Sequence, residues 1–263
     1  NMDVNKVLRD TTSDLSFLLQ TTVSDALEEN LVFSVNSNQE YTIIERINPK
    51  CKVCWDQDPP YNKYCYTNDG QQAAAGCVAI AGAQALSVLQ PQMSMITSWS
   101  EITKQYPTSD AIDQIARLVS YIGQQIGMKY GTGSSGAKVS RLASLFTKYG
   151  IIDYGDDKSI EVLKTTNGII VISAFRAKHG WGPWKHYVDG HAFLADGYVK
   201  YDKEDDPYYL HLNYGWGPSY NKDVYVLSSQ KEWDEEKGWK AYGTIFPHKI
   251  DFYTFTYPYE KNW

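Results

Sequence analysis

Cys77 is the residue whose setting most suggests chemistry. It follows Gly76 and begins a run of small apolar residues, CVAIAGAQALSVLQ. Because this run has helical propensity and stops at Pro91, we expect a buried helix with Cys77 in its first turn. A thiol there lies beside unpaired N–H groups and the positive end of the helix dipole, which favour the thiolate. Cys77 is therefore a candidate nucleophile, and the alternative is a small thiol packed among Ala and Gly.

A nucleophilic cysteine needs a base, and His191 is the histidine best placed to supply one. It begins HAFLADGY, a strand-like segment, and the polar residues 202–206 predict a hairpin turn before YYLHLNYGWG. With the turn centred between 202 and 204, the residue opposite His191 lies between 213 and 217. Asn213 and Trp216 then reach the same end of the hairpin, where an amide orients an imidazole and an indole excludes water. The alternative for His191 is a core histidine.

Five motifs follow one another along the chain: DQDPPYN, GQQAAAGCVAIAGAQ, MKYGTGSSGA, GHAFLADGY and HLNYGWG. With them the chain resembles the streptopain-like (C10) family of papain-fold cysteine peptidases of bacteria, over roughly residues 50–250. The resemblance implies an α+β fold of two lobes, a helical lobe carrying Cys77 and an antiparallel β-sheet lobe carrying His191. It also implies protein or peptide substrates, no metal or organic cofactor, and a secreted, periplasmic or cell-surface location.

The resemblance also assigns roles to single residues. Cys77 corresponds to the nucleophile, His191 to the base, Asn213 to the orienting amide and Gln57 to the glutamine of the oxyanion hole. The implied function is that of a secreted cysteine endopeptidase that hydrolyses peptide bonds in proteins. Thiolate Cys77 would attack the carbonyl carbon, and His191 would protonate the leaving amine.

Two arguments select different glutamines for the oxyanion hole. Gln71 lies six residues before Cys77, the spacing that classical papain-like enzymes show. The resemblance selects Gln57, whose loop is made rigid by Pro59 and Pro60. We favour Gln57 because an oxyanion donor must be held in place before the reaction.

We expect the substrate cleft to be lined by Trp216, Tyr214, Ser135 and Gly190. The chain departs from the family pattern near these positions. Tyr214 stands where the family usually has Trp, and Ser173 stands near a position that usually holds Gln. The segment RAKHGWGPWKHYVDG before His191 is longer than usual. Substrate preference therefore does not follow from the resemblance.

The chain divides into two predicted units. For residues 1–48 the sequence predicts an N-terminal helix within 11–30 followed by a hairpin. This unit is either a remnant of the inhibitory propeptide of a zymogen or a lineage-specific addition. Residues 49–263 form the peptidase domain. It contains helices near 110–125 and 138–148, a Gly/Ser loop between them, and strands in GIIVISAF, GHAFLADGYV, YYLHLNYGW, DVYVLSS and DFYTFTY.

The overall composition excludes several classes of protein. The net charge is −6 without a Lys/Arg cluster, which argues against nucleic acid as a partner. No apolar run reaches the length of about 18 residues that predicts a membrane span. The loop GTGSSGAK departs from a P-loop, since Ala137 stands where Lys should follow the second glycine. His179, His186, His191 and Asp189 fit no compact zinc pattern.

The four cysteines lie close together in the sequence, at positions 51, 54, 65 and 77. A four-cysteine zinc site would need a second CxxC pair, so we disfavour zinc. Cys51 and Cys54 could pair with each other, or one of them with Cys65, while Cys77 must stay free to react. The 21 Tyr and 8 Trp residues allow a second class of function, an inactive peptidase fold that binds proteins or glycans. The joint presence of Cys, His, Asn and Gln argues against it.

Overall fold

The computed structural model describes residues 33–35, 39–155, 159–180, 185–202, 208–218, 224–234, 238–241 and 248–258. The helix predicted within residues 11–30 lies outside these described residues. Within them, a group of helices is followed along the chain by a mainly antiparallel sheet. The predicted α+β order is confirmed.

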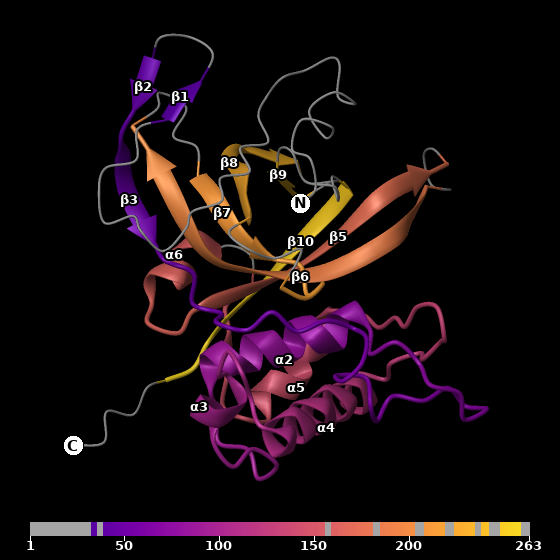
Figure 1. Ribbon diagram of the computed structural model, residues 1–263. Helices are drawn as coiled ribbons and strands as arrows, with labels where there is room; N and C mark the ends of the chain where they lie inside the picture. The colour runs from indigo at the N-terminus through magenta and orange to yellow at the C-terminus, as the bar shows by residue number, and fades with distance from the viewer. Residues whose placement is uncertain are drawn as a thin grey trace.

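The helices of the first half gather on one side of the sheet (Figure 1). They are α2 (Cys77–Leu89), α3 (Trp99–Ile102), α4 (Ser109–Gln125) and α5 (Ser140–Thr147). The helix predicted from Cys77 is confirmed as α2, and α4 and α5 match the other two predicted helices. α2 ends at Leu89 because Gln90 adopts a left-handed conformation ahead of Pro91.

Among the described residues of the second half, all the strands from β5 to β10 overlap predicted strand segments except β9, which was not predicted. They are β5 (Ile169–His179), β6 (His186–Tyr201), β7 (Tyr208–Asn213), β8 (Val224–Asp234), β9 (Gly238–Ala241) and β10 (His248–Thr256). They hydrogen-bond in the order β6-β5-β10-β9-β8-β7, and a further pairing of β7 with β6 returns the order to its start. The short strand β4 (Ile152–Asp153) pairs with β10, and helix α6 (Ser159–Lys164) precedes β5.

In the described part of the chain, three short strands precede the helices. β1 (Phe33–Val35) and β2 (Gln39–Tyr41) form the predicted N-terminal hairpin. β3 (Ile43–Ile47) then pairs with β6, so this strand belongs to the main sheet. The division of the chain into residues 1–48 and 49–263 stays a prediction, and the sheet itself includes residues from both parts.

The β6–β7 hairpin has the register that the sequence predicts. Leu194 pairs with Asn213, and Ala195 pairs with Leu212. Continuing this register beyond Asn213 brings Trp216 opposite His191. The approach of Trp216 to His191 at this end of the hairpin therefore follows from the strand pairing.

Alternate residues of β6 face two different cores, as expected for a strand. Ala192 and Leu194 pack in the core on the helix side of the sheet. Phe193 and Ala195 pack in a second core on the other face. His191, two residues before Phe193, stacks on the Phe193 ring with centroids 5.8 Å apart.

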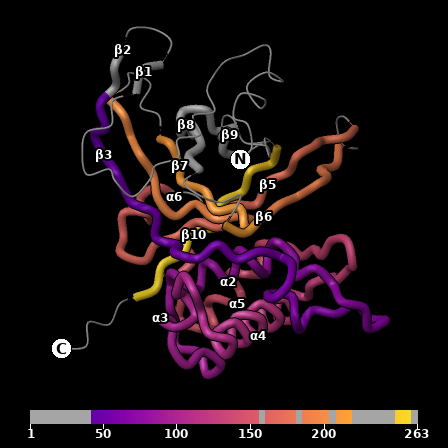
Figure 2. Tube along the Cα trace, viewed as in Figure 1, coloured from indigo at the N-terminus to yellow at the C-terminus, as the bar shows by residue number. Residues whose placement is uncertain are grey.

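An extended segment, here called the 50–57 strip, runs between the sheet and α2 (Figures 1 and 2). Most residues of α2 are small, so neighbouring segments pack closely against the helix and bury almost all of its side chains. At Gly82, for example, an added Cβ would lie 2.8 Å from Leu142 Cδ2. Among the described residues, no helix combines the length and the apolar character that crossing a membrane requires.

Candidate active site

Cys77 is the first residue of α2, and the structure presents its thiol at the start of a rigid helix. Gly76 at the N-cap provides no side-chain hydrogen bond, so the first N–H groups of the helix remain directed at the thiol. Gly76 has φ of 88°, a conformation that disfavours residues with a side chain. An added Cβ there would also lie 2.7 Å from Met128 Cε. The position before Cys77 therefore requires glycine.

Ser135 braces the segment that leads into α2. Its hydroxyl donates to the Ala74 carbonyl oxygen at 2.7 Å and accepts from the Gly131 N–H at 3.0 Å. Gly131 O accepts in turn from the Ala74 N–H at 3.2 Å. The hydroxyl of Ser135 is already hydrogen-bonded to the backbone. If Ser135 lines the substrate cleft as predicted, it would contribute by its position rather than by a hydrogen bond to the substrate.

Burial raises the pKa of the Cys77 thiol above its ordinary value, and the backbone N–H groups of Ala192, Val78 and Cys77 itself oppose that rise. The sequence predicts a stabilised thiolate from the helix start alone. In the free protein, the burial of the sulfur raises the thiol pKa by more than the helix start and the N–H groups lower it. The hydrogen bond from the Ala192 N–H also shows that the Cys77 sulfur lies beside β6, at the residue next to His191.

The imidazole of His191 is held by a main-chain carbonyl. Nε2 lies 2.7 Å from the carbonyl oxygen of Tyr214. Since a carbonyl oxygen can only accept, Nε2 carries the proton and Nδ1 presents a lone pair. A neutral ring with this tautomer can act as a general base through Nδ1.

Aromatic rings cover His191. The ring of Trp216 is stacked on the imidazole with centroids 4.8 Å apart, and Tyr214 is stacked on Trp216 at 5.0 Å. Phe193 lies on β6 two residues away, with its centroid 5.8 Å from the imidazole. Burial among these rings lowers the pKa of His191 to about 4, although the Tyr214 carbonyl acts in the opposite direction. The imidazole is therefore neutral at pH 7.

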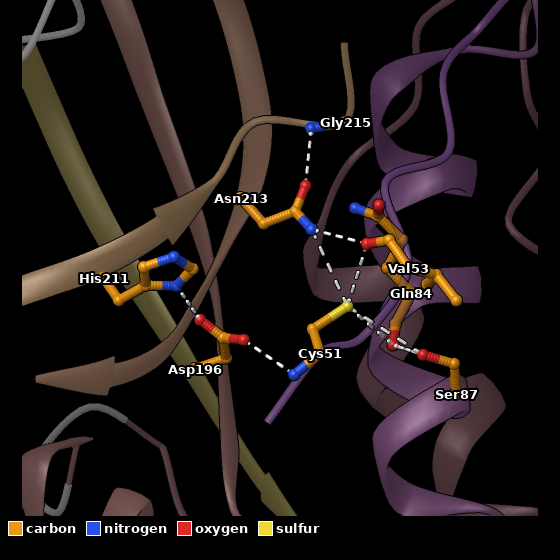
Figure 3. Close-up of polar contacts among 8 residues, drawn as sticks. All are labelled: Cys51, Val53, Gln84, Ser87, Asp196, His211, Asn213 and Gly215. Atoms are coloured by element: carbon orange, nitrogen blue, oxygen red, sulfur yellow. Dashed lines mark hydrogen bonds and ion pairs between the residues drawn. The ribbon is translucent and has the colours of Figure 1, made fainter. Parts of the chain in front are cut away.

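Asn213 pairs with Leu194 on the strand that carries His191, and its side-chain amide bonds to the 50–57 strip and to Gly215 (Figure 3). Nδ2 donates to the Val53 carbonyl oxygen at 2.8 Å, and Oδ1 accepts from the Gly215 N–H at 3.1 Å. The hydrogen bond that the sequence predicts from this amide to the imidazole is made by the Tyr214 carbonyl instead. Asn213 fixes the turn that carries this carbonyl.

The two candidate glutamines occupy different environments. The Gln57 carbonyl oxygen accepts from the Ala75 N–H at 2.9 Å, which ties Gln57 to the segment just before Cys77. Gln71 is exposed, and its amide donates to Asp69 at 2.8 Å within a turn. The geometry therefore favours Gln57 as the residue beside the nucleophile.

A pocket of about 510 Å³ lies between Gln57 and Trp216. Residues 56–58 form one wall, and residues 215–218, which include Trp216, form the other. Gly190 is exposed beside His191 and pairs with Phe175 across the sheet. An added Cβ at Gly190 would lie 2.8 Å from Phe175 Cε1, so a side chain there would displace the aromatic ring.

No disulfide links any of the four cysteines, all of which lie among the described residues, so the pairings considered from the sequence do not form in the structure. The described residues contain no group of three or more metal-binding side chains. His179 and His186 stack on each other with centroids 5.7 Å apart, at the far end of the β5–β6 hairpin from His191.

Sequence reasoning did not find a second polar group behind the site. Asp196 is fully buried and lies 2.5 Å from His211 Nδ1, while its other oxygen accepts from the Cys51 N–H at 2.7 Å. A charged residue inside the apolar strand segment HAFLADGY was the available signal, because a buried carboxylate needs partners.

The chain was compared with protein families and with solved structures. The family model of the Peptidase C10 family matches residues 55–223, more than half of the chain. No curated protein matched. A fragment of prointerpain A from Prevotella intermedia is 18% identical, with 82% of this chain and 74% of that chain covered and a TM-score of 0.54. The active wild-type interpain A cysteine protease of the same organism is 19% identical, with 82% and 97% covered and a TM-score of 0.51. The two likenesses confirm the predicted papain-like fold, and the family match confirms the resemblance drawn from the motifs.

Proposed function

This chain belongs to the peptidase C10 family and is a cysteine-type endopeptidase, and we propose that Cys77 is its nucleophile and His191 its base. The observation that carries the proposal is the Ala192 N–H directed at the Cys77 sulfur. That contact is made by the residue next to His191, on the strand that carries the imidazole. The two side chains come from the helical and the β-sheet part of the fold, as a papain-like site requires.

The first step joins proton transfer to attack. Burial disfavours either charge alone, so the thiol and the imidazole are both neutral before substrate binds. The thiol proton moves to Nδ1 of His191 as the sulfur bonds to the scissile carbonyl carbon. The Tyr214 carbonyl, which accepts from Nε2–H, stabilises the imidazolium that forms. The imidazolium then protonates the leaving amine, and water hydrolyses the thioester with His191 again as base.

The oxyanion of the tetrahedral intermediate needs donors that are already in place. We assign this role to the backbone N–H of Cys77 and the side-chain amide of Gln57. The hydrogen bond between the Gln57 carbonyl oxygen and the Ala75 N–H supports the assignment because it holds the Gln57 backbone beside the nucleophile. Asn213 acts through the Tyr214 carbonyl, and Trp216 keeps water from the imidazole. Tyr214, Ser135 and Gly190 complete the surface that receives the substrate.

The substrates of this family are proteins and peptides. We further propose that residues 1–48 are the remnant of an inhibitory propeptide. The fold shared with a fragment of prointerpain A, a proenzyme by its name, supports this assignment. A secreted, periplasmic or cell-surface location is part of the same proposal.

The direct test is hydrolysis of denatured casein by the reduced protein, with and without a thiol alkylator. We expect hydrolysis that the alkylator abolishes, with Cys77 as the residue modified when activity is lost. Mass mapping after partial alkylation identifies the labelled thiol. Full hydrolysis after quantitative labelling of Cys77 would contradict the assignment. An absence of hydrolysis under all conditions would favour the second function, an inactive fold that binds proteins or glycans.

A further inference from the structure

The 50–57 strip is hydrogen-bonded to the sheet along one side. The N–H groups of Lys50 and Cys51 donate to the Asp196 backbone oxygen and carboxylate at 3.3 and 2.7 Å. Farther along, Val53 O accepts from Asn213 Nδ2 at 2.8 Å, and Trp55 O accepts from the Gly217 N–H at 3.4 Å. The strip is therefore fixed to β6, to the end of β7 and to the segment that follows β7.

The other side of the strip is fixed to the helix that carries Cys77. The Trp55 N–H donates to Gln84 Oε1 at 3.1 Å, from the middle of α2. The Cys51 sulfur lies 3.9 Å from both the Gln84 carbonyl oxygen and Ser87 Oγ. Because it bonds to both sides, the strip sets the separation between the sheet that bears His191 and the helix that bears Cys77.

Asp196 joins three segments at a single buried carboxylate (Figure 3). Oδ2 accepts from the Cys51 N–H of the strip, and Oδ1 lies 2.5 Å from Nδ1 of His211 on β7. Asp196 itself belongs to β6. Its exposed fraction is 0%, so these hydrogen bonds are shielded from water and hold the groups firmly.

We propose that Asp196 is a positioning residue for the reaction, acting on His191 through the 50–57 strip and Asn213. By fixing Cys51 and His211, it aligns Val53 O with Asn213, two residues beyond His211. Asn213 then holds the turn whose Tyr214 carbonyl accepts from the imidazole. This inference rests on the proposed function, since it adds a residue to the same site.

A purely structural role for Asp196 would lower stability without a specific effect on turnover. Asn167 provides a matched control because it is also buried and makes comparable bonds away from the site. Its Nδ2 donates to Tyr257 O at 2.8 Å, and its Oδ1 accepts from Thr256 Oγ1 at 2.9 Å. The experiment compares Asp196→Ala with Asn167→Ala, using enzyme whose reactive Cys77 has been quantified by titration.

We expect Asp196→Ala to lower kcat by on the order of 10–100-fold, because small displacements of reacting groups have effects of that size. KM should change by less than about threefold, since the lost alignment matters most in the transition state. Asn167→Ala should lower the melting temperature and leave the kcat of titrated enzyme within about twofold. Asp196→Asn keeps the size and part of the hydrogen bonding, so it should recover part of the lost rate.

Proton NMR supplies a readout that a structural role would not move. The Nε2 proton of His191 should give a low-field, slowly exchanging signal, identified by its absence in His191→Gln. We expect Asp196→Ala to shift or broaden this signal and Asn167→Ala to leave it in place. If Asp196→Ala does not fold, Asp196→Asn takes its place, with a smaller loss of kcat and the same shift expected.

Equal kcat values for the Asp196 and Asn167 variants, with the His191 signal unchanged, would overturn the positioning role. The proposed function is tested separately by His191→Gln. If His191→Gln is inactive while the Asp196 variants match the control, the positioning role alone fails. If His191→Gln keeps full activity, the proposed function fails and the positioning role fails with it.

Discussion

Two cysteine–histidine pairs lie in this fold, one at the start of α2 and one behind it. The first is Cys77 with His191, and the second is Cys51 with His211, joined through Asp196. By residue type alone, the second group resembles a catalytic triad more closely, because it includes a carboxylate bonded to the histidine. The surroundings of each sulfur distinguish the two cysteine–histidine pairs.

The Cys51 sulfur meets two carbonyl acceptors as well as the Asn213 amide, which donates to it at 3.7 Å, whereas the hydrogen bonds at the Cys77 sulfur come from backbone N–H groups. Cys51 Sγ lies 3.5 Å from the Val53 carbonyl oxygen, and burial together with the nearby Asp196 carboxylate raises its pKa strongly. Burial also raises the pKa of Cys77, but the N–H groups at its sulfur stabilise the thiolate as it forms. The histidines also differ. His211 uses Nδ1 on Asp196, while His191 uses Nε2 on the Tyr214 carbonyl oxygen. These differences in burial and hydrogen bonding are the basis on which we propose the first pair, rather than the second, as the reactive one.

The largest effect should come from exchanging the two thiols for alanine. Cys77→Ala should lower kcat/KM on casein-derived peptides by on the order of 10⁴-fold or more, because the nucleophile is lost. Cys51→Ala keeps the backbone N–H that Asp196 binds, so it should retain hydrolysis within about tenfold and lose about 1 kcal/mol of stability. Circular dichroism controls for folding of both variants. Comparable losses of activity would remove the distinction between the two pairs.

The next largest effect concerns the oxyanion donor. Gln57→Ala should lower kcat by on the order of 10²–10³-fold, with alkylation of Cys77 little changed, because the lost donor acts on the oxyanion rather than on the thiol. Gln71→Ala is the matched control, since its amide is bonded to Asp69 in an exposed turn. It should leave kcat within about twofold. The reverse ranking would show that spacing along the chain is the better guide to this residue.

The elements that position the first pair follow from the sequence for physical reasons. Small residues after Cys77 and the stop at Pro91 define a buried helix, and hairpin pairing alone brings Trp216 opposite His191. These are local rules of helix propensity and strand register. The choice of Gln57 needed the family resemblance, because the spacing to Cys77 pointed to Gln71.

The orientation of side chains did not follow from the sequence. Asn213 reads as the partner of His191, yet its amide faces the 50–57 strip and a main-chain carbonyl holds the imidazole. Every residue has a backbone carbonyl, so the sequence does not indicate which carbonyl will accept a hydrogen bond from the imidazole. The expected thiolate of Cys77 likewise depended on burial, which the helix start alone does not give. Local patterns predict where the chain runs, whereas tertiary packing decides what each polar group meets.

A third prediction uses the pKa of His191 to test the resting state of the reactive pair. The folded pKa of about 4 lies below the value of 6.5 for an unperturbed histidine. The unfolded chain therefore takes up a proton as pH falls below 6.5, while the folded protein does so only near pH 4. The stability associated with neutral His191 is fully present above pH 6.5 and is lost between those values, by about 3 kcal/mol.

Urea unfolding at pH 7 and pH 4.5 measures this loss, with His191→Gln as the reference. Other titrating groups contribute to both proteins, so the difference between them isolates His191. We expect the wild type to lose about 2–3 kcal/mol more than His191→Gln on acidification. If the free enzyme instead held a Cys77 thiolate beside a His191 imidazolium, the folded pKa would be raised. The wild type would then lose stability as pH rises, and the sign of the difference would be reversed.

The smallest effect should come from the Tyr214 side chain. Its backbone carbonyl holds His191, and its ring is stacked on Trp216 at an interplanar angle of 15°. Tyr214→Phe preserves the carbonyl and the stacked ring, so kcat and KM should stay within about threefold of the wild type. Asn213→Ala, by contrast, removes the bonds that fix this turn and should lower kcat by more than tenfold, since the carbonyl is then free to move. A larger loss in Tyr214→Phe than in Asn213→Ala would mean that the tyrosine hydroxyl, rather than the main chain, supports the reactive histidine.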